Sequence, residues 1–188
     1  MKEVKNLQLF SREKAHNNKE RVEQIILAKY NQYYRLAYNY VHNEADACDI
    51  VQNGAYKALR SSDTLQNPEF AETWIYRIML NECFRYFKQT QPLSYETVFE
   101  EETKAEYSKD SETSIDLQRA LDTLPKKEKA IVVLKYFEDK TLEEIATILD
   151  ENVNTVKSKL YRSIKKLRGV LSDGENMQDY KISNGKDI

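Results

Sequence analysis

The chain has 188 residues and a formal net charge of -2, so its overall charge does not indicate a nucleic-acid partner. Four glycines, three prolines and 32% charged residues are typical of a helical protein. Two cysteines, Cys48 and Cys83, are too few for a disulfide framework and favour a reducing cytoplasm. No apolar run approaches membrane-spanning length, and residues 1–20 lack the apolar segment of a signal peptide.

The first part of the chain predicts two helices behind a loose lead-in. Residues 1–18 are polar and of mixed charge, and we expect them to form an N-terminal extension without packed structure. Apolar residues at helical spacing then predict helices over about 19–41 and 44–60, the second capped by Asn43. The faces expected to be buried consist of Val22, Ile26, Tyr30, Tyr33, Ala37 and Tyr40, and of Ala47, Ile50, Val51, Ala55, Ala58 and Leu59.

A third helix is predicted after a polar loop at residues 61–67. Asn67 is placed to cap this helix, and Pro68 stands at its first position, where the missing N–H costs nothing. We expect the helix to end near Lys88 and to complete a helical domain over residues 19–90. Its expected core comprises Phe70, Trp74, Ile75, Ile78, Met79 and Phe84.

The composition changes sharply over residues 91–116, where eight acids stand against two lysines and apolar residues are sparse. Such a segment buries too little apolar surface to fold alone, so we assign residues 91–113 to a flexible acidic linker. A second helical domain is expected over residues 114–172. The remaining residues, 173–188, form a polar tail that we expect to fray.

Two helices are predicted at the start of this second domain. Apolar spacing resumes near Ile115, and Pro125 then opens a helix over residues 126–138. The apolar positions in these helices are Ala120, Leu121, Leu124, Ile131, Leu134 and Phe137.

The clearest pattern in the chain follows, and it predicts a helix-turn-helix. Thr141 and Glu144 have the spacing of a capping box, and a short turn precedes a second helix capped by Asn152 or Asn154. From Asn154 to Arg168 this helix carries six cations and no acid, as a helix that enters the DNA major groove requires. The apolar stripes of the two helices are Leu142, Ile145, Ala146 and Leu149, and Val156, Leu160, Ile164 and Leu167.

Three segments together resemble the extracytoplasmic-function (ECF) sigma factors of the bacterial sigma-70 family. Residues 46–59 resemble region 2.2 of that family, residues 73–81 resemble regions 2.3–2.4, and residues 124–167 resemble region 4. The order and spacing of the segments, with an acidic linker between them, make the resemblance specific. It implies an all-α fold of two small helical domains, a region 2-like bundle and a region 4-like helix-turn-helix.

The resemblance also implies a function. ECF sigma factors bind the beta and beta-prime subunits of core RNA polymerase and direct promoter-specific initiation of transcription, so we expect a cytoplasmic protein of a cell-envelope or extracytoplasmic stress response. Promoter DNA is the second implied partner, and an anti-sigma factor, often membrane-bound, is the third. No small-molecule substrate and no cofactor are implied.

Residues of the region 2.2-like segment are the implied contacts with core polymerase. Asp49 and Gln52 match the family motif, and Asn53 lies beside them. The family commonly has an acid at the positions of Cys48 and Asn53, so this chain departs from the pattern at both.

The third predicted helix interleaves aromatic and basic residues, as surfaces that bind unpaired DNA do. We expect Tyr76, Arg77, Asn81 and Arg85 to contact the downstream, minus-10 promoter element, because they lie off the expected buried stripe. Asn81 matches a family asparagine that helps to read this element. In the family the preceding loop, here residues 61–67, forms a pocket for a flipped base.

The second helix of the helix-turn-helix carries the implied contacts with the upstream, minus-35 element. We expect Thr155, Lys157, Ser158, Tyr161 and Arg162 to face the groove. Arg162 and Lys157 suit contacts with guanine, and Thr155 and Ser158 suit contacts with phosphates.

The turn between these two helices departs from the family pattern at two positions. Asp150 stands where the family usually has Gly, and Glu151 stands where it usually has an apolar residue. Asp tolerates a left-handed backbone better than most residues, and we expect Val153 to supply the missing apolar contact.

The sequence leaves two other classes of protein open and argues against a metalloprotein or an enzyme. His42, Glu44, Asp46 and Cys48 do not converge on one ion if they lie on a helix, and neither a nucleophile triad nor a phosphate-binding Gly loop is present, so we expect no catalytic residue, metal or enzyme activity. A conventional helix-turn-helix regulator with an N-terminal sensing or dimerisation domain is the main alternative. A decoy protein with a vestigial DNA surface is a further one.

Overall fold

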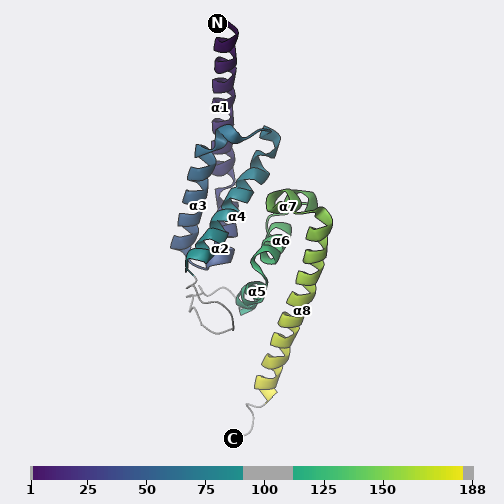
Figure 1. The fold of residues 1–188 in the computed structure, drawn as a ribbon. Coiled ribbons are helices and arrows are strands. Elements are labelled where there is room, and N and C mark those ends of the chain that lie inside the picture. The colour runs from purple at the N-terminus through teal and green to yellow at the C-terminus, as the bar shows by residue number, and fades with distance from the viewer. Residues whose placement is uncertain (1, 91–111, 184–188) are drawn as a thin grey trace. The chain divides into compact units, whose positions relative to one another are not determined.

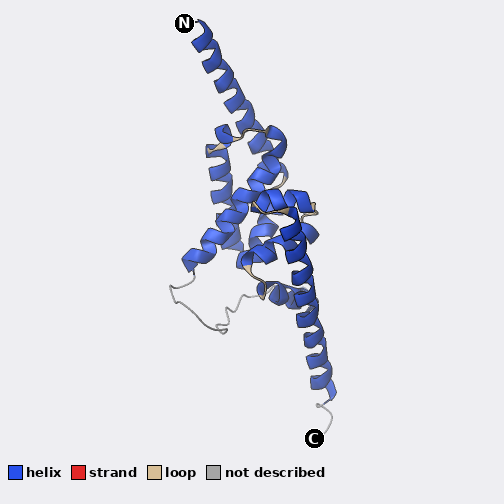
Figure 2. Ribbon diagram, turned by 45° about the vertical axis from the view of Figure 1, so that its right-hand side comes forward, coloured by secondary structure: helices blue, strands red, loops and turns tan. Residues whose placement is uncertain are grey.

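The computed structural model describes residues 2–90 and 112–183 (Figure 1). Within these ranges the chain forms helices and turns and no strand, as Figure 2 shows. The chain divides into two compact units, residues 1–100 and 101–188. The prediction of an all-α protein with two helical domains is therefore confirmed. Residues 91–111, most of the predicted linker, lie outside the described residues.

The N-terminal unit is a bundle in which α2, α3 and α4 pack against one another and α1 packs against α3 and α4. Its core is rich in tyrosine. The rings of Tyr33 and Tyr76 meet edge to face with centroids 4.9 Å apart, and Tyr40 meets Phe84 at 5.9 Å. The elements are α1 (Lys2–Ala28), α2 (Tyr30–Val41), α3 (Glu44–Arg60), the 3-10 turns η1 (Ser62–Thr64) and η2 (Pro68–Phe70), and α4 (Ala71–Thr90).

Two of the predicted helix starts in this unit are confirmed. The Asn43 side chain accepts a hydrogen bond from the backbone N–H of Asp46 at 3.0 Å, and α3 begins at the next residue. Asn67 accepts one from the N–H of Glu69 at 3.0 Å, and Pro68 follows Asn67 as the first residue of η2. Each capping side chain satisfies a backbone donor that the helix leaves unpaired.

Two expectations for the first helix are wrong. The lead-in is helical, because α1 begins at Lys2 and the stretch contains neither Gly nor Pro to interrupt it. The helix expected over residues 19–41 is divided, because Lys29 leaves the helical conformation with φ -113° and ψ 16°. Tyr30, the residue directly after this break, is exposed instead of buried.

Several members of the expected apolar faces are less buried than predicted. Phe70 is 56% exposed, because η2 turns its side chain away before α4 begins. Half-buried positions are Trp74, Ile78, Phe84, Ala55 and Leu59. Two large side chains that the pattern did not include, Leu36 and Leu80, are fully buried instead.

The C-terminal unit consists of α5 (Glu112–Asp122), α6 (Lys126–Tyr136), α7 (Leu142–Leu149) and α8 (Val153–Ser183). Helices α5, α6 and α7 all pack against α8. Phe137, expected in the core, is exposed because α6 ends one residue earlier and Phe137 is its C-terminal cap. The core side chains include Leu121, Ile131, Leu134, Ile145, Ile148 and Val156.

The expectation of a frayed tail from residue 173 is also wrong. Helix α8 continues to Ser183, since the segment after Arg168 has no proline and isolated glycines cost a helix only about 1 kcal/mol each. Residues 184–188 lie outside the described residues.

Candidate nucleic-acid interface

Local hydrogen bonds fix the starts of α7 and of α8. Thr141 Oγ1 accepts from the Glu144 N–H at 3.1 Å, and Glu144 Oε2 accepts from the Thr141 N–H at 2.8 Å, so the predicted capping box is present. Asp150 has the left-handed conformation expected of it, with φ 56° and ψ 49°. Asn152, one of the two candidate caps, accepts from the Asn154 N–H at 2.8 Å and starts α8.

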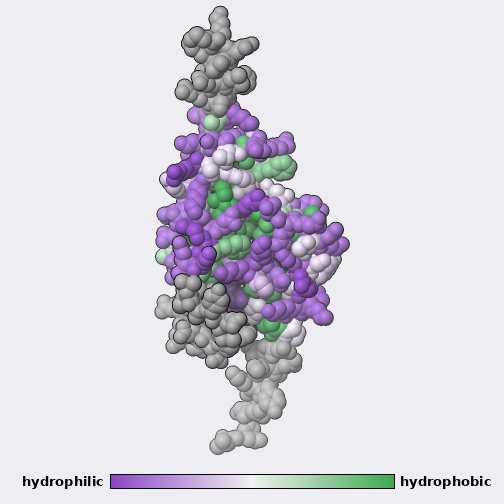
Figure 3. Space-filling view, in the orientation of Figure 1, coloured by the Kyte–Doolittle hydropathy of each residue, from purple (hydrophilic) through white to green (hydrophobic). Residues whose placement is uncertain are grey.

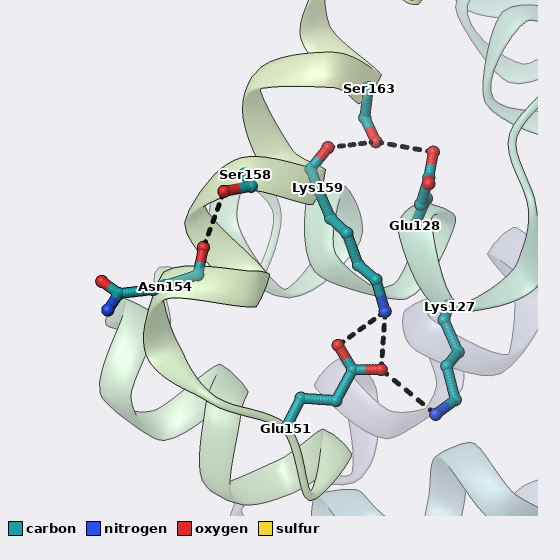
Figure 4. Close-up of polar contacts among 7 residues, drawn as sticks. All are labelled: Lys127, Glu128, Glu151, Asn154, Ser158, Lys159 and Ser163. Atoms are coloured by element: carbon teal, nitrogen blue, oxygen red, sulfur yellow. Dashed lines mark hydrogen bonds and ion pairs between the residues drawn. The ribbon is translucent and has the colours of Figure 1, made fainter.

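Glu151 joins α8 to α6 through two lysines (Figure 4). Lys159 Nζ lies 2.7 Å from both carboxylate oxygens, and Lys127 Nζ lies 3.1 Å from one of them. Burial by itself would raise the pKa of the Glu151 carboxyl, but the hydrogen bonds from both lysines outweigh it and hold the pKa below its ordinary value. Glu151 thus makes a polar contact at the position where the family usually has an apolar residue, and Val153, expected to supply the apolar contact, is half-buried.

A second polar contact between α6 and α8 was not predicted. Ser163 is fully buried, and its hydroxyl lies 2.9 Å from the Lys159 carbonyl and 3.4 Å from Glu128 Oε2 (Figure 4). The apolar pattern pointed to its neighbour Ile164, which is only half-buried. A small hydroxyl in the stripe lets α8 approach α6 closely.

The exposed face of α8 contains all five residues predicted to face the groove: Thr155, Lys157, Ser158, Tyr161 and Arg162. The Ser158 hydroxyl donates to the Asn154 carbonyl at 2.9 Å, which leaves its lone pairs toward solvent. The cations Lys165, Lys166 and Arg168 are exposed further along the helix, and Lys166 bonds the Thr123 carbonyl. This face combines donors for base edges with charges for phosphates.

The N-terminal unit has an open hollow of about 500 Å³ beside the start of η1. Asn81 is exposed and lines it, as predicted from its position on α4. The loop after α3 forms the opposite side, so part of the loop expected to hold a base does face Asn81. The other lining residues are Lys57, Arg60, Ser61, Asp63, Thr64, Ile78 and Glu82.

A buried carboxylate holds two cations at this hollow. Glu82 is buried, and its oxygens pair with Lys57 Nζ and, at 2.5 Å, with an Arg85 guanidinium nitrogen. Arg85 is exposed as predicted, whereas Arg77, one turn before Asn81, is half-buried. The spacing of Arg77, Asn81 and Arg85 places them along one side of α4.

The prediction for Tyr76 is wrong. Its ring is fully buried against Tyr33, and its hydroxyl lies 3.2 Å from Gln32 Oε1, so it presents no face to DNA. The reason is that α4 packs against both α2 and α3, which buries a wider sector of its surface than one apolar stripe.

The outer face of α3 exposes Asp49, Gln52 and Asn53, the residues predicted to contact a protein partner. Behind this face, burial raises the pKa of the Tyr86 phenol to about 12, with the hydrogen bond to Asp46 adding to the effect. Tyr86 thus connects α4 to the first turns of α3.

The described residues offer neither a metal-binding cluster nor a membrane-spanning helix. No group of three or more His, Cys, Asp or Glu side chains there is placed to hold a metal ion. None of the described helices combines the length and apolarity needed to cross a membrane. The face drawn in Figure 3 is mostly hydrophilic, with apolar atoms in small separate areas.

Known protein families match both helical units of the chain. Residues 25–92 match the family description "Sigma-70 region 2", and residues 114–167 match "Sigma-70, region 4". RNA polymerase sigma factor SigV of Bacillus subtilis is 43% identical over 139 residues, which cover 72% of this chain and 82% of SigV. ECF RNA polymerase sigma factor SigW of the same organism is 30% identical over 155 residues, which cover 74% of this chain and 83% of SigW.

A solved structure shows the same fold. The sigma factor RpoE of Bartonella quintana, crystallised with the anti-sigma factor NepR, has a TM-score of 0.61 at 20% identity. The match covers 80% of this chain and 96% of RpoE.

Proposed function

The chain belongs to the extracytoplasmic-function group of sigma-70 family RNA polymerase sigma factors, and from this membership we propose that it binds core RNA polymerase and directs promoter-specific initiation of transcription. The observation that carries the proposal is the presence of both family regions in order, each with its implied contact residues mostly exposed. A sigma factor confers promoter choice and does not itself catalyse a reaction. It acts in the bacterial cytoplasm, in a response to stress on the cell envelope.

Helix α8 reads the upstream promoter element. Arg162 and Lys157 donate hydrogen bonds to guanine edges in the major groove, where a bidentate contact contributes about 1–3 kcal/mol of discrimination. Thr155 and Ser158 bind phosphates, and the exposed Tyr161 ring contacts the groove wall. The geometry supports this assignment because all five side chains leave the same half of a helix whose other half is buried.

The hollow beside η1 receives an unpaired base of the downstream element. The Asn81 amide both donates and accepts hydrogen bonds, which suits the edge of a base, and Ser61 and Thr64 lie across the hollow from it. Arg77 and Arg85 bind flanking phosphates along α4. Tyr76 has no part in this contact.

The outer face of α3 binds core polymerase through Asp49, Gln52 and Asn53. These polar side chains are exposed on a helix that packs firmly on α2 and α4, so they form a rigid docking surface. An anti-sigma factor is a further partner, because the related fold of RpoE was solved in complex with one.

Reconstituted transcription tests the proposal. The purified chain is added to sigma-free core polymerase on fragmented DNA of the host genome, and discrete transcripts that require the chain are expected. Changing Asp49→Ala together with Gln52→Ala should abolish co-elution with core polymerase and the transcripts. Glu23→Ala with Gln24→Ala is the matched control, since both residues are exposed on α1.

The outcomes separate the alternatives. Tight binding of duplex operator DNA without polymerase, unaffected by the change at Asp49 and Gln52, would instead identify a conventional regulator. Co-elution of the wild-type chain without any transcript from its host genome would favour a decoy.

A further inference from the structure

A buried amide on α1 lies outside both regions that match the family. Asn18 is only 2% exposed, and it precedes the first residue of the matched segment, 25–92, by seven positions. Its Nδ2 donates a hydrogen bond to the backbone carbonyl of Leu65 at 2.9 Å, across 47 positions of the chain. Buried polar groups need such partners, so this bond fixes the relative position of two segments that are distant in sequence.

The carbonyl that Asn18 holds belongs to the loop that lines the hollow. Leu65 immediately follows η1, and Ser61, Asp63 and Thr64 of the same loop face the hollow. Hydrogen bonds within this loop are local. The Ser62 hydroxyl donates to Leu59 at 2.9 Å, the Thr64 hydroxyl to Ser61 at 2.6 Å, and the Leu65 N–H to Ser62 at 3.2 Å.

Local bonds determine the shape of the turn but not its place over the rest of the unit. That place depends on contacts with α1, which packs directly against η1. Val22, one helical turn after Asn18, is fully buried on the same side of α1. Asn18 is therefore the polar end of the face through which α1 supports the loop.

We propose that Asn18 is a positioning residue for recognition of the downstream promoter element. Its amide holds the loop so that Ser61 and Thr64 stand across the hollow from Asn81, and the segment before residue 25 thereby takes part in promoter choice. The inference rests on the proposed function of the hollow as a base pocket. Asn18 itself touches no DNA.

Loss of the amide has a specific expected effect. Without a donor the Leu65 carbonyl is buried and unsatisfied, which favours conformations in which the loop moves toward water. Affinity then falls in proportion to the population of the loop position that binds the base. We expect a loss of about five-fold or more in affinity for the correct strand. Binding of a strand with the wrong bases should not change, because phosphate contacts on α4 remain.

The test uses the full chain in complex with core polymerase. Transcripts from the reconstituted reaction map the downstream element, and its non-template strand is synthesised as a labelled oligonucleotide, with a scrambled version for comparison. Asn18→Ala removes the amide, and Asn18→Leu removes it while filling the same space. Asn17→Ala is the matched control, because Asn17 is the exposed neighbour. The measured quantity is the affinity for the correct strand divided by the affinity for the scrambled strand. The affinity of each variant for core polymerase is measured in parallel.

The expected result is a fall in this ratio for both Asn18 variants, with unchanged core binding and with Asn17→Ala like wild type. An unchanged ratio in a folded Asn18 variant overturns the proposal, and so does a loss of core binding equal to the loss of strand binding. If Asn18→Ala does not fold, Asn18→Leu decides. If the wild-type chain prefers neither strand, the base pocket itself is refuted. If Asn81→Ala loses the preference while the Asn18 variants keep it, only the role of Asn18 is refuted.

Discussion

Replacing Glu151 with Gln tests how α8 is held against α6. The Glu151 side chain is 11% exposed, that of Lys159 is 22% exposed and that of Lys127 is 57% exposed. Exposed ion pairs contribute about 0.2–1 kcal/mol, whereas breaking a buried pair costs about 3–5 kcal/mol. The Lys159 pair lies between these limits, so we expect it to contribute about 1–2 kcal/mol. The Lys127 pair is well solvated, and we expect about 0.5 kcal/mol or less from it.

Two double-mutant cycles measure these contributions. Glu151→Gln is combined with Lys159→Met in one cycle and with Lys127→Met in the other, and hydrogen exchange of peptides from α6 and α8 in the full chain reports local stability. Trp74 is the single tryptophan and lies in the other unit, so its fluorescence is an internal control for unaffected folding there. Equal coupling energies in the two cycles, or none with Lys159, would show that the carboxylate does not act as described.

The pH dependence of the same site has a defined sign. Because the pKa of Glu151 is lowered in the folded state, its stabilising effect is complete above the ordinary carboxyl pKa. The effect is lost as the pH falls through the lower, folded-state value. Protection of α8 should therefore decrease in acid by a smaller amount in Glu151→Gln than in wild type.

Three other changes test the packing and capping of the two units. Gly54→Ala places a Cβ 2.3 Å from the sulfur of the buried Met79, and repacking costs about 1–3 kcal/mol against about 1 kcal/mol gained because Ala favours the helix. We therefore expect a net loss of about 0–2 kcal/mol in denaturant unfolding followed by tryptophan fluorescence. The pKa of Tyr86 is raised from the ordinary 10 to about 12, so the folded state favours the neutral phenol. This stabilising effect is complete below pH 10 and is lost as the pH rises to about 12. Tyr86→Phe should therefore lessen the loss of stability between pH 10 and 12. Part of the alkaline sensitivity should remain in this variant, since burial also raises the pKa of Tyr40. Thr141→Ala should cost about 1 kcal/mol of protection at the start of α7 by hydrogen exchange, since it removes the capping hydroxyl.

Helix starts were the part of the fold that the sequence predicted best. Asn43, Asn67 and Thr141 each bond a backbone N–H two or three residues ahead, so the signal and its consequence lie in the same short segment. The left-handed Asp150 was predictable for the same reason. Local patterns therefore located α3, η2 and α7 without knowledge of the tertiary fold.

Burial on α4 was predicted less well, because its packing depends on two neighbouring helices at once. Ile75, Tyr76, Met79 and Leu80 are all buried, and together they cover more than one stripe. The sequence pattern identified Ile75 and Met79 but assigned Tyr76 to the DNA surface. An amphipathic tyrosine gives no signal to separate a core ring from a stacking ring, since it occurs in both places.

Polar groups that act over long distances in sequence were not predicted. Asn18 bonds Leu65 and Glu151 bonds Lys127, at separations of 47 and 24 positions. An isolated Asn or Glu in a polar segment looks solvated, and only the arrangement of the helices shows that it is buried. The same limit applied to Ser163, which is fully buried although serine is usually found at the surface.

A buried acid limits the charge of the candidate DNA surface on the N-terminal unit. Glu82 neutralises part of the charge of Lys57 and Arg85 at the hollow. Glu151 instead pairs with Lys159 on α8 and Lys127 on α6, which lie outside the five residues predicted to face the groove. Each phosphate neutralised on a single strand contributes about 0.7 to the slope of log affinity against log salt concentration, and cations already paired with an acid contribute less. Glu82→Gln keeps the shape of the side chain and frees both cations. For a scrambled single strand, the slope of log affinity against log salt concentration should therefore increase in magnitude by about 0.7–1.4. A slope that is unchanged in the folded variant would mean that neither cation reaches a phosphate, and the downstream contact would then depend on Asn81 and the loop alone.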